Sequence, residues 1–287
     1  SYADLSTRVA SVANAIDELG VGTADRVALC YPNTARYLVA TLAVARAGAV
    51  PVPINVELGH EKITYIFEDC SASILLLSAD EVVQEAVTPA IESATGIKLV
   101  AVDSDTVELS LSGTDVCSLR ELAQDADDSH SPAPVSASDP AMQPYTSGST
   151  GRPKGVVLSH GGVSWCTKAF VDHLQLDERE RGLVVTPLYH KNAMTGVVKP
   201  MLECGGSFVV LEEFESATVI DAIDSYGVTY MTGVPAIYKR LVAEYDQTPD
   251  DDLSSLSWVS CGSAAVPKEL VTAFETTFDA QLLEVYG

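Results

Sequence analysis

The sequence predicts an α/β fold made of two packed lobes, each a parallel-rich sheet covered by helices. Short apolar runs typical of buried strands alternate with amphipathic segments of helical spacing along most of the chain. Repeated strand–helix–strand units give parallel sheets, because the crossover helix packs back on its own sheet. The alternation stops over residues 103–140, which are rich in Ser, Asp, Ala and Pro. We therefore expect a first lobe at 1–138, ending in this acidic connection, and a second at 139–287.

The first lobe is expected to begin with an amphipathic helix at Tyr2. Its apolar positions recur every three or four residues up to Leu19, and Gly20 follows as a helix stop. The elements that follow are strands at 26–30, 50–54, 73–77 and 98–102 and helices at 34–47 and near 61–69 and 81–94.

The second lobe follows a surface connection over residues 103–140. Its strands are expected near 183–187, 207–211, 228–232, 258–261 and 282–286, with helices between them.

The chain is strongly acidic: 17 Lys and Arg residues against 40 Asp and Glu residues give a formal net charge of −23. A surface of this sign repels polyanions, which excludes nucleic-acid binding. No membrane span is expected, because the apolar runs fall far short of the roughly 20 residues that a span needs. The acids are spread evenly and Lys is scarce. This pattern favours an acidic proteome and a halophilic source, with a merely acidic cytosolic protein as the alternative.

The six cysteines contain no C-x-x-C pair, and the five histidines form no cluster with metal-ligand spacing. Reduced, mostly buried thiols and no metal site are therefore expected. No basic and apolar leader is visible at the start of the sequence. Together these features predict a cytoplasmic, metal-free scaffold.

The segment from Tyr145 to Gly155, YTSGSTGRPKG, carries the clearest chemical signal. Its glycines let several backbone N–H groups face one anion, its hydroxyls add donors, and Lys154 adds a positive charge. This composition predicts a cradle for a triphosphate or pyrophosphate with a divalent cation. A Walker A loop is excluded, because Pro153 stands five residues after Gly148, where that motif has its second glycine. A flexible linker is the alternative, and the lysine and the strand-like run after it disfavour that interpretation.

Two other patterns suggest hydrolases and are rejected. Cys261 precedes Gly and Ser, but the second cysteine and the aromatic residue of a cysteine-protease signature are missing, which favours a structural thiol. Ser159 and His160 have no acidic partner in the pattern, and the sequence contains no G-x-S-x-G elbow.

The chain resembles the adenylate-forming, AMP-binding enzymes, which include acyl- and aryl-CoA synthetases, peptide-synthetase adenylation domains and luciferases. The segment at 145–155 is similar to the phosphate-binding signature of that superfamily. Four further segments match in the family's order: 48–55 (GAVPVPIN), 187–190 (PLYH), 262–265 (GSAA) and 285–287 (VYG, the start of Y-G-x-T-E). The resemblance covers nearly the whole chain and is strongest to an acyl- or aryl-CoA synthetase. It implies the large N-terminal domain of the acyl-CoA synthetase and luciferase-like fold, in incomplete form.

The resemblance implies a two-step ligase whose partners are a carboxylic acid, ATP and coenzyme A. A fatty or aromatic carboxylate attacks the α-phosphate of Mg-ATP, which gives an acyl-adenylate and pyrophosphate, and the thiol of coenzyme A then displaces AMP. Carried over to this chain, the phosphate donors are Thr146, Ser147, Gly148, Ser149, Thr150, Gly151 and Lys154. The residues implied beside the adenine are Gly262, Ser263 and Ala264, with Tyr286 stacked on its ring.

The catalytic candidate is His190 of the PLYH segment, which is expected to act as a positioning group between the acyl pocket and the thiol channel. A lone histidine after an apolar strand is more often an ordinary core or surface residue, and the family resemblance favours the functional role here. Asn192, Met194 and Thr232 are expected to line the acyl site. No charged residue is placed to recognise the ammonium group of an amino acid.

The sequence stops at Gly287, before the Thr and Glu of Y-G-x-T-E, so we expect a C-terminal catalytic domain outside it. Alone, the chain is expected to bind nucleotide weakly and not to turn over. The strand ending at Tyr286 would present an open edge, which a homodimer or further residues would cover. Two alternatives stay open: a non-catalytic nucleotide-binding or interaction module, and an adenylation domain that loads a carrier protein.

Overall fold

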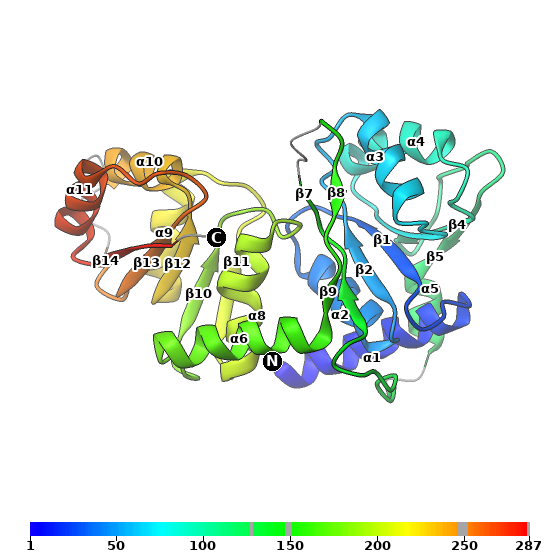
Figure 1. Cartoon of the computed structure of the whole chain (residues 1–287), viewed down its shortest axis with the longest axis horizontal. Coiled ribbons are helices and arrows are strands. Elements are labelled where there is room, and N and C mark those ends of the chain that lie inside the picture. The colour runs from blue at the N-terminus through cyan, green and yellow to red at the C-terminus, as the bar shows by residue number, and fades with distance from the viewer. Residues whose placement is uncertain (127–128, 147–150, 246–251, 286–287) are drawn as a thin grey trace. The chain divides into compact units, whose positions relative to one another are not determined.

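The computed structural model describes residues 1–126, 129–146, 151–245 and 252–285. It divides into two compact units, Ser1–Ser164 and Trp165–Gly287, and each is described by itself. Each unit contains a five-stranded parallel sheet with helices packed on it (Figure 1). The predicted fold class, α/β with parallel sheets covered by helices, is confirmed.

The sheet of the first unit has the strand order β2-β1-β3-β4-β5. Its strands are β1 (Arg26–Cys30), β2 (Val50–Pro53), β3 (Ile74–Ser78), β4 (Leu99–Asp103) and β5 (Asp115–Ser118). Its helices are α1 (Tyr2–Glu18), α2 (Ala35–Arg46), α3 (His60–Asp69), α4 (Glu81–Ser93) and α5 (Leu119–Asp125). Apolar side chains of α3 and α4 form a core with the sheet, while α1 packs against α2 and α5 (Figure 1).

These boundaries follow the sequence pattern closely. The run Val27 to Cys30 of β1 is fully buried, as expected for a central strand of a parallel sheet. The chain leaves α1 through Gly20, whose φ of +76° lies in the left-handed region that glycine adopts without strain.

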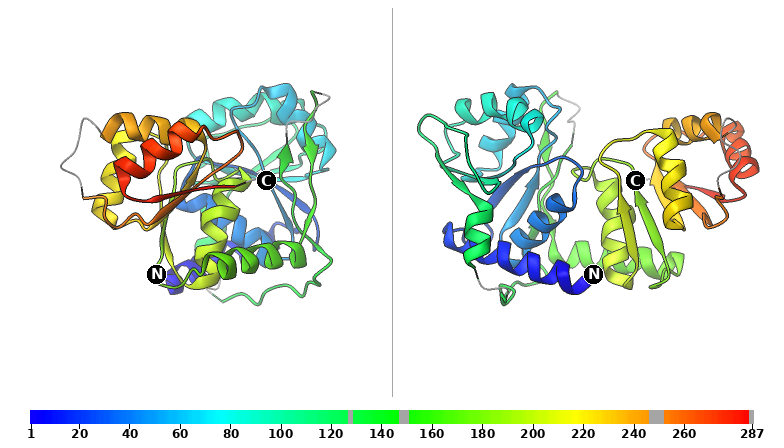
Figure 2. Two further views of the ribbon diagram at one scale, coloured as in Figure 1. Left: turned by 60° about the vertical axis from the view of Figure 1, so that its left-hand side comes forward. Right: turned by 180° about the vertical axis from the view of Figure 1, so that it is seen from behind.

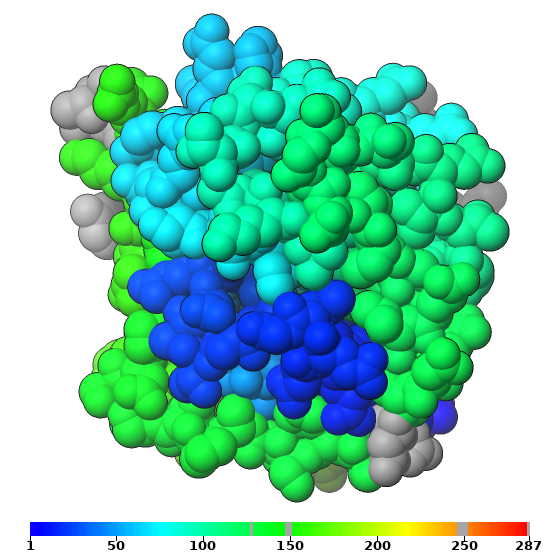
Figure 3. All heavy atoms as spheres, turned by 90° about the vertical axis from the view of Figure 1, so that its right-hand side faces the viewer, coloured from blue at the N-terminus to red at the C-terminus, as the bar shows by residue number. Residues whose placement is uncertain are grey.

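The expectation that residues 103–140 form only an irregular connection is wrong in part. β5 joins the sheet edge beside β4, Leu119 is buried, and α5 packs against α1. β5 (DVCS) is partly exposed and lacks a continuous apolar run, and α5 has only seven residues, too few to show a helical apolar repeat. Figure 3 shows part of this segment, in green tones, on the surface of the first unit.

The next stretch forms two short antiparallel ladders. β6 (Pro140–Met142) pairs with β9 (Leu158–Ser159), and β7 (Tyr145–Thr146) pairs with β8 (Lys154–Gly155). The backbone N–H of Gln143 donates to the carbonyl of Pro51 on β2 at 3.1 Å, which ties this stretch to the first sheet. The compact units accordingly divide after Ser164, whereas the sequence places the boundary at 138/139.

The sheet of the second unit has the order β11-β10-β12-β13-β14. Its strands are β10 (Arg181–Val184), β11 (Ser207–Val210), β12 (Tyr230–Gly233), β13 (Trp258–Cys261) and β14 (Gln281–Glu284). Helix α6 (His160–Leu174) begins in the first unit and ends in the second. The later helices are α7 (Lys191–Ala193), the π-helix η1 (Met194–Val198), α8 (Lys199–Cys204), α9 (Ser216–Tyr226), α10 (Pro235–Tyr245) and α11 (Lys268–Phe278). The main core lies between this sheet and α9, α10 and α11, the yellow to red helices of Figure 2, while η1 packs on β10 and β12.

Candidate active site

The segment singled out as a phosphate cradle is carried by the β7–β8 ladder of the first unit. Thr146 lies opposite Lys154, and its hydroxyl donates to the Lys154 carbonyl at 3.5 Å. Both side chains are exposed, and the Lys154 amino group makes no ion pair with a carboxylate of the described residues. Gly151 is exposed with φ +84°, a conformation that favours glycine. The ladder, together with Gly151, therefore presents a hydroxyl, a glycine and an available positive charge to solvent.

Four members of the predicted cradle, Ser147, Gly148, Ser149 and Thr150, lie outside the described residues, and their roles stay predictions. The same holds for Tyr286, which was expected to stack on the adenine.

Sequence reasoning missed the side chains beneath this ladder. The hydroxyl of Tyr145 donates to Asp69 at 2.6 Å, and the side-chain amide of Gln143 donates to the same hydroxyl at 3.2 Å. Gln143 is itself 6% exposed and bonded to Arg26. No local pattern could reveal these contacts, because the partners are 76 and 117 positions apart in the chain.

The small-residue turn after β13 is shaped by a close backbone approach. A Cβ atom at Gly262 would lie 2.7 Å from the carbonyl oxygen of Val285, so only glycine fits there. Gly262 also donates to the Gly233 carbonyl at 3.2 Å, which joins the ends of β12 and β13. Ser263 follows with φ +65°, an uncommon conformation for a residue with a side chain. Ser263 and Ala264 are exposed, so this strained turn is open to a ligand.

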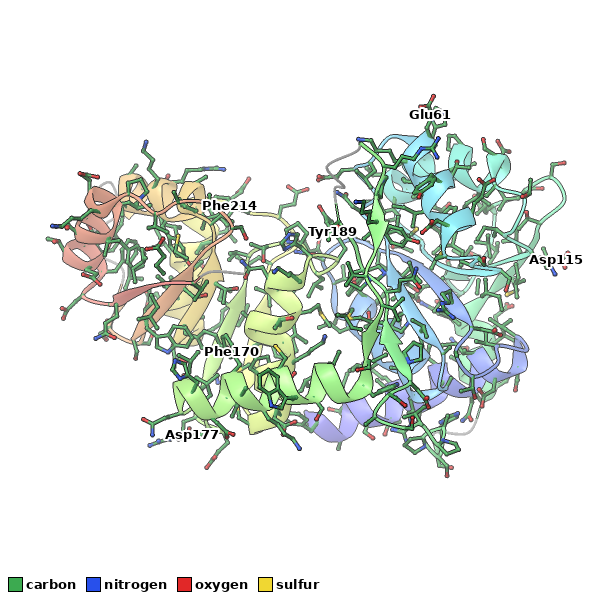
Figure 4. The ribbon with its side chains drawn as sticks, in the orientation of Figure 1. Glu61, Asp115, Phe170, Asp177, Tyr189 and Phe214 are labelled. Atoms are coloured by element: carbon green, nitrogen blue, oxygen red, sulfur yellow. The ribbon has the colours of Figure 1, made fainter. Side chains whose placement is uncertain are left out.

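His190 is the N-cap residue of the short helix α7 and directly follows Tyr189 (labelled in Figure 4). Its Nδ1 accepts a hydrogen bond from the backbone N–H of Asn192 at 3.2 Å. An accepting Nδ1 carries no proton, so the neutral ring holds its proton on Nε2. His190 is exposed by its accessible surface, but the protein around the ring removes part of its hydration. This desolvation, and secondly the charge of Lys191, lower the pKa of His190.

The predicted acyl-site residues surround the contact between η1 and β12. Met194 opens η1 and is 4% exposed, Thr232 on β12 is 2% exposed, and Asn192 is half-buried. A Cβ atom at Gly196 would lie 2.8 Å from Cγ2 of Thr232, so this glycine lets the π-helix reach the strand. The hydroxyl of Tyr230 donates to the Gly196 carbonyl at 3.2 Å, which also holds η1 against β12.

Thr232 is the most informative of these residues. Its hydroxyl is buried and has no hydrogen-bond partner among the described residues. A buried hydroxyl without a partner is energetically unfavourable, by about 1–3 kcal/mol. A π-turn inside a helical stretch is also frequent at functional sites.

Other chemistry finds less support. Among the described residues, no group of three or more His, Cys, Asp or Glu side chains could hold a metal ion. The described helices include none that is long and apolar enough to cross a membrane. All six cysteines are free, and burial raises the pKa of Cys261 to about 11, in agreement with a structural thiol.

Solved structures of other proteins share this fold. The apo structure of MatB from Rhodopseudomonas palustris aligns with a TM-score of 0.83 and 26% identity, covering 100% of this chain and 54% of that one. A long-chain-fatty-acid-CoA ligase from Archaeoglobus fulgidus aligns with a TM-score of 0.87 over 99% of this chain and 56% of that one, at 24% identity.

Curated relatives carry related names. A feruloyl-CoA synthase of an Amycolatopsis species is 34% identical over 275 residues, which is 96% of this chain and 51% of the relative. An indoleacetate–CoA ligase of Aromatoleum aromaticum is 30% identical over 289 residues, 100% of this chain and 54% of the relative. The chain thus spans about half the length of these curated relatives. The family model described as AMP-binding enzyme matches residues 1–287. The chain therefore belongs to the AMP-binding enzyme family, whose members among its relatives are CoA ligases.

Proposed function

We propose that the protein containing this chain is an ATP-dependent carboxylate–CoA ligase that acts through an acyl-adenylate. The observation that carries the proposal is the β7–β8 ladder with the neighbouring Gly151. It exposes Thr146 and the ammonium of Lys154, which makes no ion pair with a described carboxylate, within a sequence that matches the phosphate-binding signature. Such donors suit a pyrophosphate, because hydroxyls and an ammonium bind its oxygens with charge-assisted hydrogen bonds.

The first half-reaction forms a bond between a carboxylate oxygen and the α-phosphorus of ATP and breaks the bridge to the β-phosphate. Negative charge then builds on the departing pyrophosphate. Lys154 would stabilise that charge with its ammonium group. The single O–H of Thr146 would add a donor after turning from the Lys154 carbonyl, to which its bond is long at 3.5 Å. Ser147 to Thr150 are proposed to add further donors.

In the second half-reaction the sulfur of coenzyme A bonds to the acyl carbon, AMP leaves, and the thiol proton passes to solvent or a base. His190 is proposed as a positioning group for this exchange, with its Nδ1 occupied by the Asn192 N–H and its proton on Nε2. Gly262, Ser263 and Ala264 are proposed to lie beside the adenine, with Tyr286 stacked on it.

The acid is proposed to bind in a site lined by Asn192, Met194 and Thr232. The names of the feruloyl and indoleacetate relatives support an aromatic acid, and the buried apolar surroundings of Met194 agree with an uncharged tail. The hydroxyl of Thr232, which has no partner among the described residues, would suit a polar ring substituent or chain atom of that acid.

Mg²⁺ is proposed to enter bound to ATP as part of the substrate. The described residues bring together no set of His, Cys, Asp or Glu side chains for a resident ion, so no step is assigned to one. The excess of 23 negative charges makes an accompanying cation useful for any polyanionic substrate.

Two features of the whole protein belong to the same proposal. The free thiols support a cytoplasmic, reducing location. Within the described sheet, β14 is an edge strand, so a homodimer is proposed to cover it, and sedimentation of the full-length protein tests this.

The proposal is tested by acid-dependent exchange of pyrophosphate into ATP, with a panel of aromatic, fatty and short-chain acids and the full-length protein. Exchange with aromatic acids, followed by thioester formation with coenzyme A, is the expected result. Adenylation with transfer only to a carrier protein would identify a carrier-loading domain. Binding of ATP without exchange for any acid would favour the non-catalytic module.

A further inference from the structure

We propose that a row of hydrogen-bonded side chains between α3 and β7 positions the phosphate-binding segment, with Asp69 and Tyr145 as its central pair. The inference rests on the proposed function and adds to it positioning residues that lie outside the signature. Tyr145 is the first residue of the segment at 145–155, and Asp69 is the last residue of α3, the helix that begins beside the labelled Glu61 in Figure 4.

The contacts around Tyr145 are continuous. Its hydroxyl donates to Oδ2 of Asp69 at 2.6 Å, and Oδ1 of the same carboxylate accepts from the hydroxyl of Tyr65 at 3.2 Å. On the other side, the amide of Gln143 donates to the Tyr145 oxygen at 3.2 Å, and Arg26 donates to Oε1 of Gln143 at 3.2 Å. The Tyr145 ring is therefore fixed through both a donor and an acceptor.

The row holds the segment at both ends. Tyr145 stands at its start, and near its end the guanidinium of Arg152 lies over the Tyr65 ring, 5.6 Å from the centroid. The β7–β8 ladder pairs Tyr145 with Gly155 and the next residue with Lys154. A displacement of Tyr145 would therefore move Lys154 through the backbone of the ladder.

Burial and charge strengthen the hydrogen bond between Tyr145 and Asp69. Tyr145 is half-buried, and burial, followed by its hydrogen bond to Asp69, raises its pKa, so the hydroxyl keeps its proton as a donor. Hydroxyl-to-carboxylate bonds of this length are the charge-assisted kind, which are roughly twice as strong as neutral ones.

The close surroundings of Gly155 also support a positioning role for the row. A Cβ atom at that position would lie 2.7 Å from Nε2 of Gln143 and 3.0 Å from the hydroxyl oxygen of Tyr145. The glycine that ends the signature thus leaves room for the row, whether or not it also approaches a phosphate.

The test compares Tyr145→Phe and Asp69→Ala with the conservative Asp69→Asn, all in the full-length protein. Tyr31→Phe is the matched control, since it removes a buried tyrosine hydroxyl that has no partner among the described residues. Trypsin cleavage after Lys154, followed by mass spectrometry, reports the order of the segment without any ligand. We expect cleavage to be roughly 10-fold faster in Tyr145→Phe and Asp69→Ala, intermediate in Asp69→Asn, and unchanged in the control.

Kinetics then separate positioning from general destabilisation. The KM for MgATP is expected to rise about 10-fold in the two disruptive variants, with the KM for the acid unchanged, and Asp69→Asn is expected to recover part of the loss. Unchanged cleavage in both variants would overturn the inference, and so would an equal rise of both KM values with a lowered Tm. If the wild-type protein shows no exchange activity, the proposed function fails, while the cleavage comparison still decides whether the row positions the segment.

Discussion

Lys154 contributes the positive charge of the phosphate-binding segment, and its side chain is exposed without an ion pair to the described carboxylates. Replacement by Met removes that charge and keeps the length of the side chain. A hydrogen bond between charged groups contributes about 1.5–3 kcal/mol, so we expect kcat/KM for MgATP to fall roughly 10- to 100-fold. Lys98→Met, which removes an exposed lysine directly before β4, is the control and should leave kcat/KM unchanged. Equal losses in both variants would assign the effect to net charge instead.

His190 gives a prediction about pH. Its pKa lies below the ordinary 6.5, first because of desolvation and then because of Lys191. For a base whose pKa is lowered on folding, the neutral form is favoured in the folded state, so the Nδ1 cap is present above pH 6.5 and is lost as pH falls through the folded-state pKa. NMR titration of the ring is expected to give a midpoint below 6.5. Lys191→Ala should raise this midpoint without reaching 6.5, because desolvation is the larger cause, while Lys191→Arg should leave it in place. A wild-type midpoint above 6.5 would contradict the assignment.

At the scale of elements, the contact between η1 and β12 depends on one glycine. Gly196→Ala would place a methyl group 2.8 Å from Cγ2 of Thr232, and overpacking of this kind costs about 1–3 kcal/mol. Thermal unfolding should therefore occur at a lower temperature. Thr232→Ala removes the opposing methyl and hydroxyl, so the double variant is expected to regain most of the loss. Gly59→Ala is the control, because nothing lies within 4 Å of the added atom. Additive losses in the double variant would show that the two residues do not oppose each other.

The elements also show what the sequence could predict and what it could not. β1 and the other central strands were predictable because burial on both faces demands a continuous apolar run. β5 and α5 were missed because they are short and polar at a sheet edge. The phosphate-binding segment could be predicted because its residues are contiguous in the sequence. The Asp69–Tyr145 pair was not, since the fold alone brings together residues 76 positions apart.

At the scale of the whole molecule, the net charge of −23 exceeds what ion pairs can neutralise. Even if every Lys and Arg paired with one acid, 23 acids would remain, and in the described ranges the arginine–aspartate pairs involve only Arg36, Arg120 and Arg179. Salt weakens those few pairs, which contribute about 0–1 kcal/mol each, but it also screens the repulsion among all the remaining acids. The Debye length falls from about 10 Å at 0.1 M to about 3 Å at 1 M. Repulsion therefore dominates, and salt is expected to stabilise the protein, as the halophilic source predicted from the composition would require.

The measurement is thermal unfolding of the full-length protein in KCl from about 0.01 to 2 M, a range that takes the Debye length from about 30 Å to below 3 Å. Tm and solubility should both rise, most steeply below about 1 M, where the screening length changes most. Sucrose at matched osmolality is the control, because an excluded neutral solute stabilises compact states without screening charge. A rise in KCl that sucrose does not reproduce supports the electrostatic explanation. Equal stability and solubility at low and high KCl would show that the acids are spaced widely enough to be tolerated without salt, and the halophilic source would then lose its physical basis.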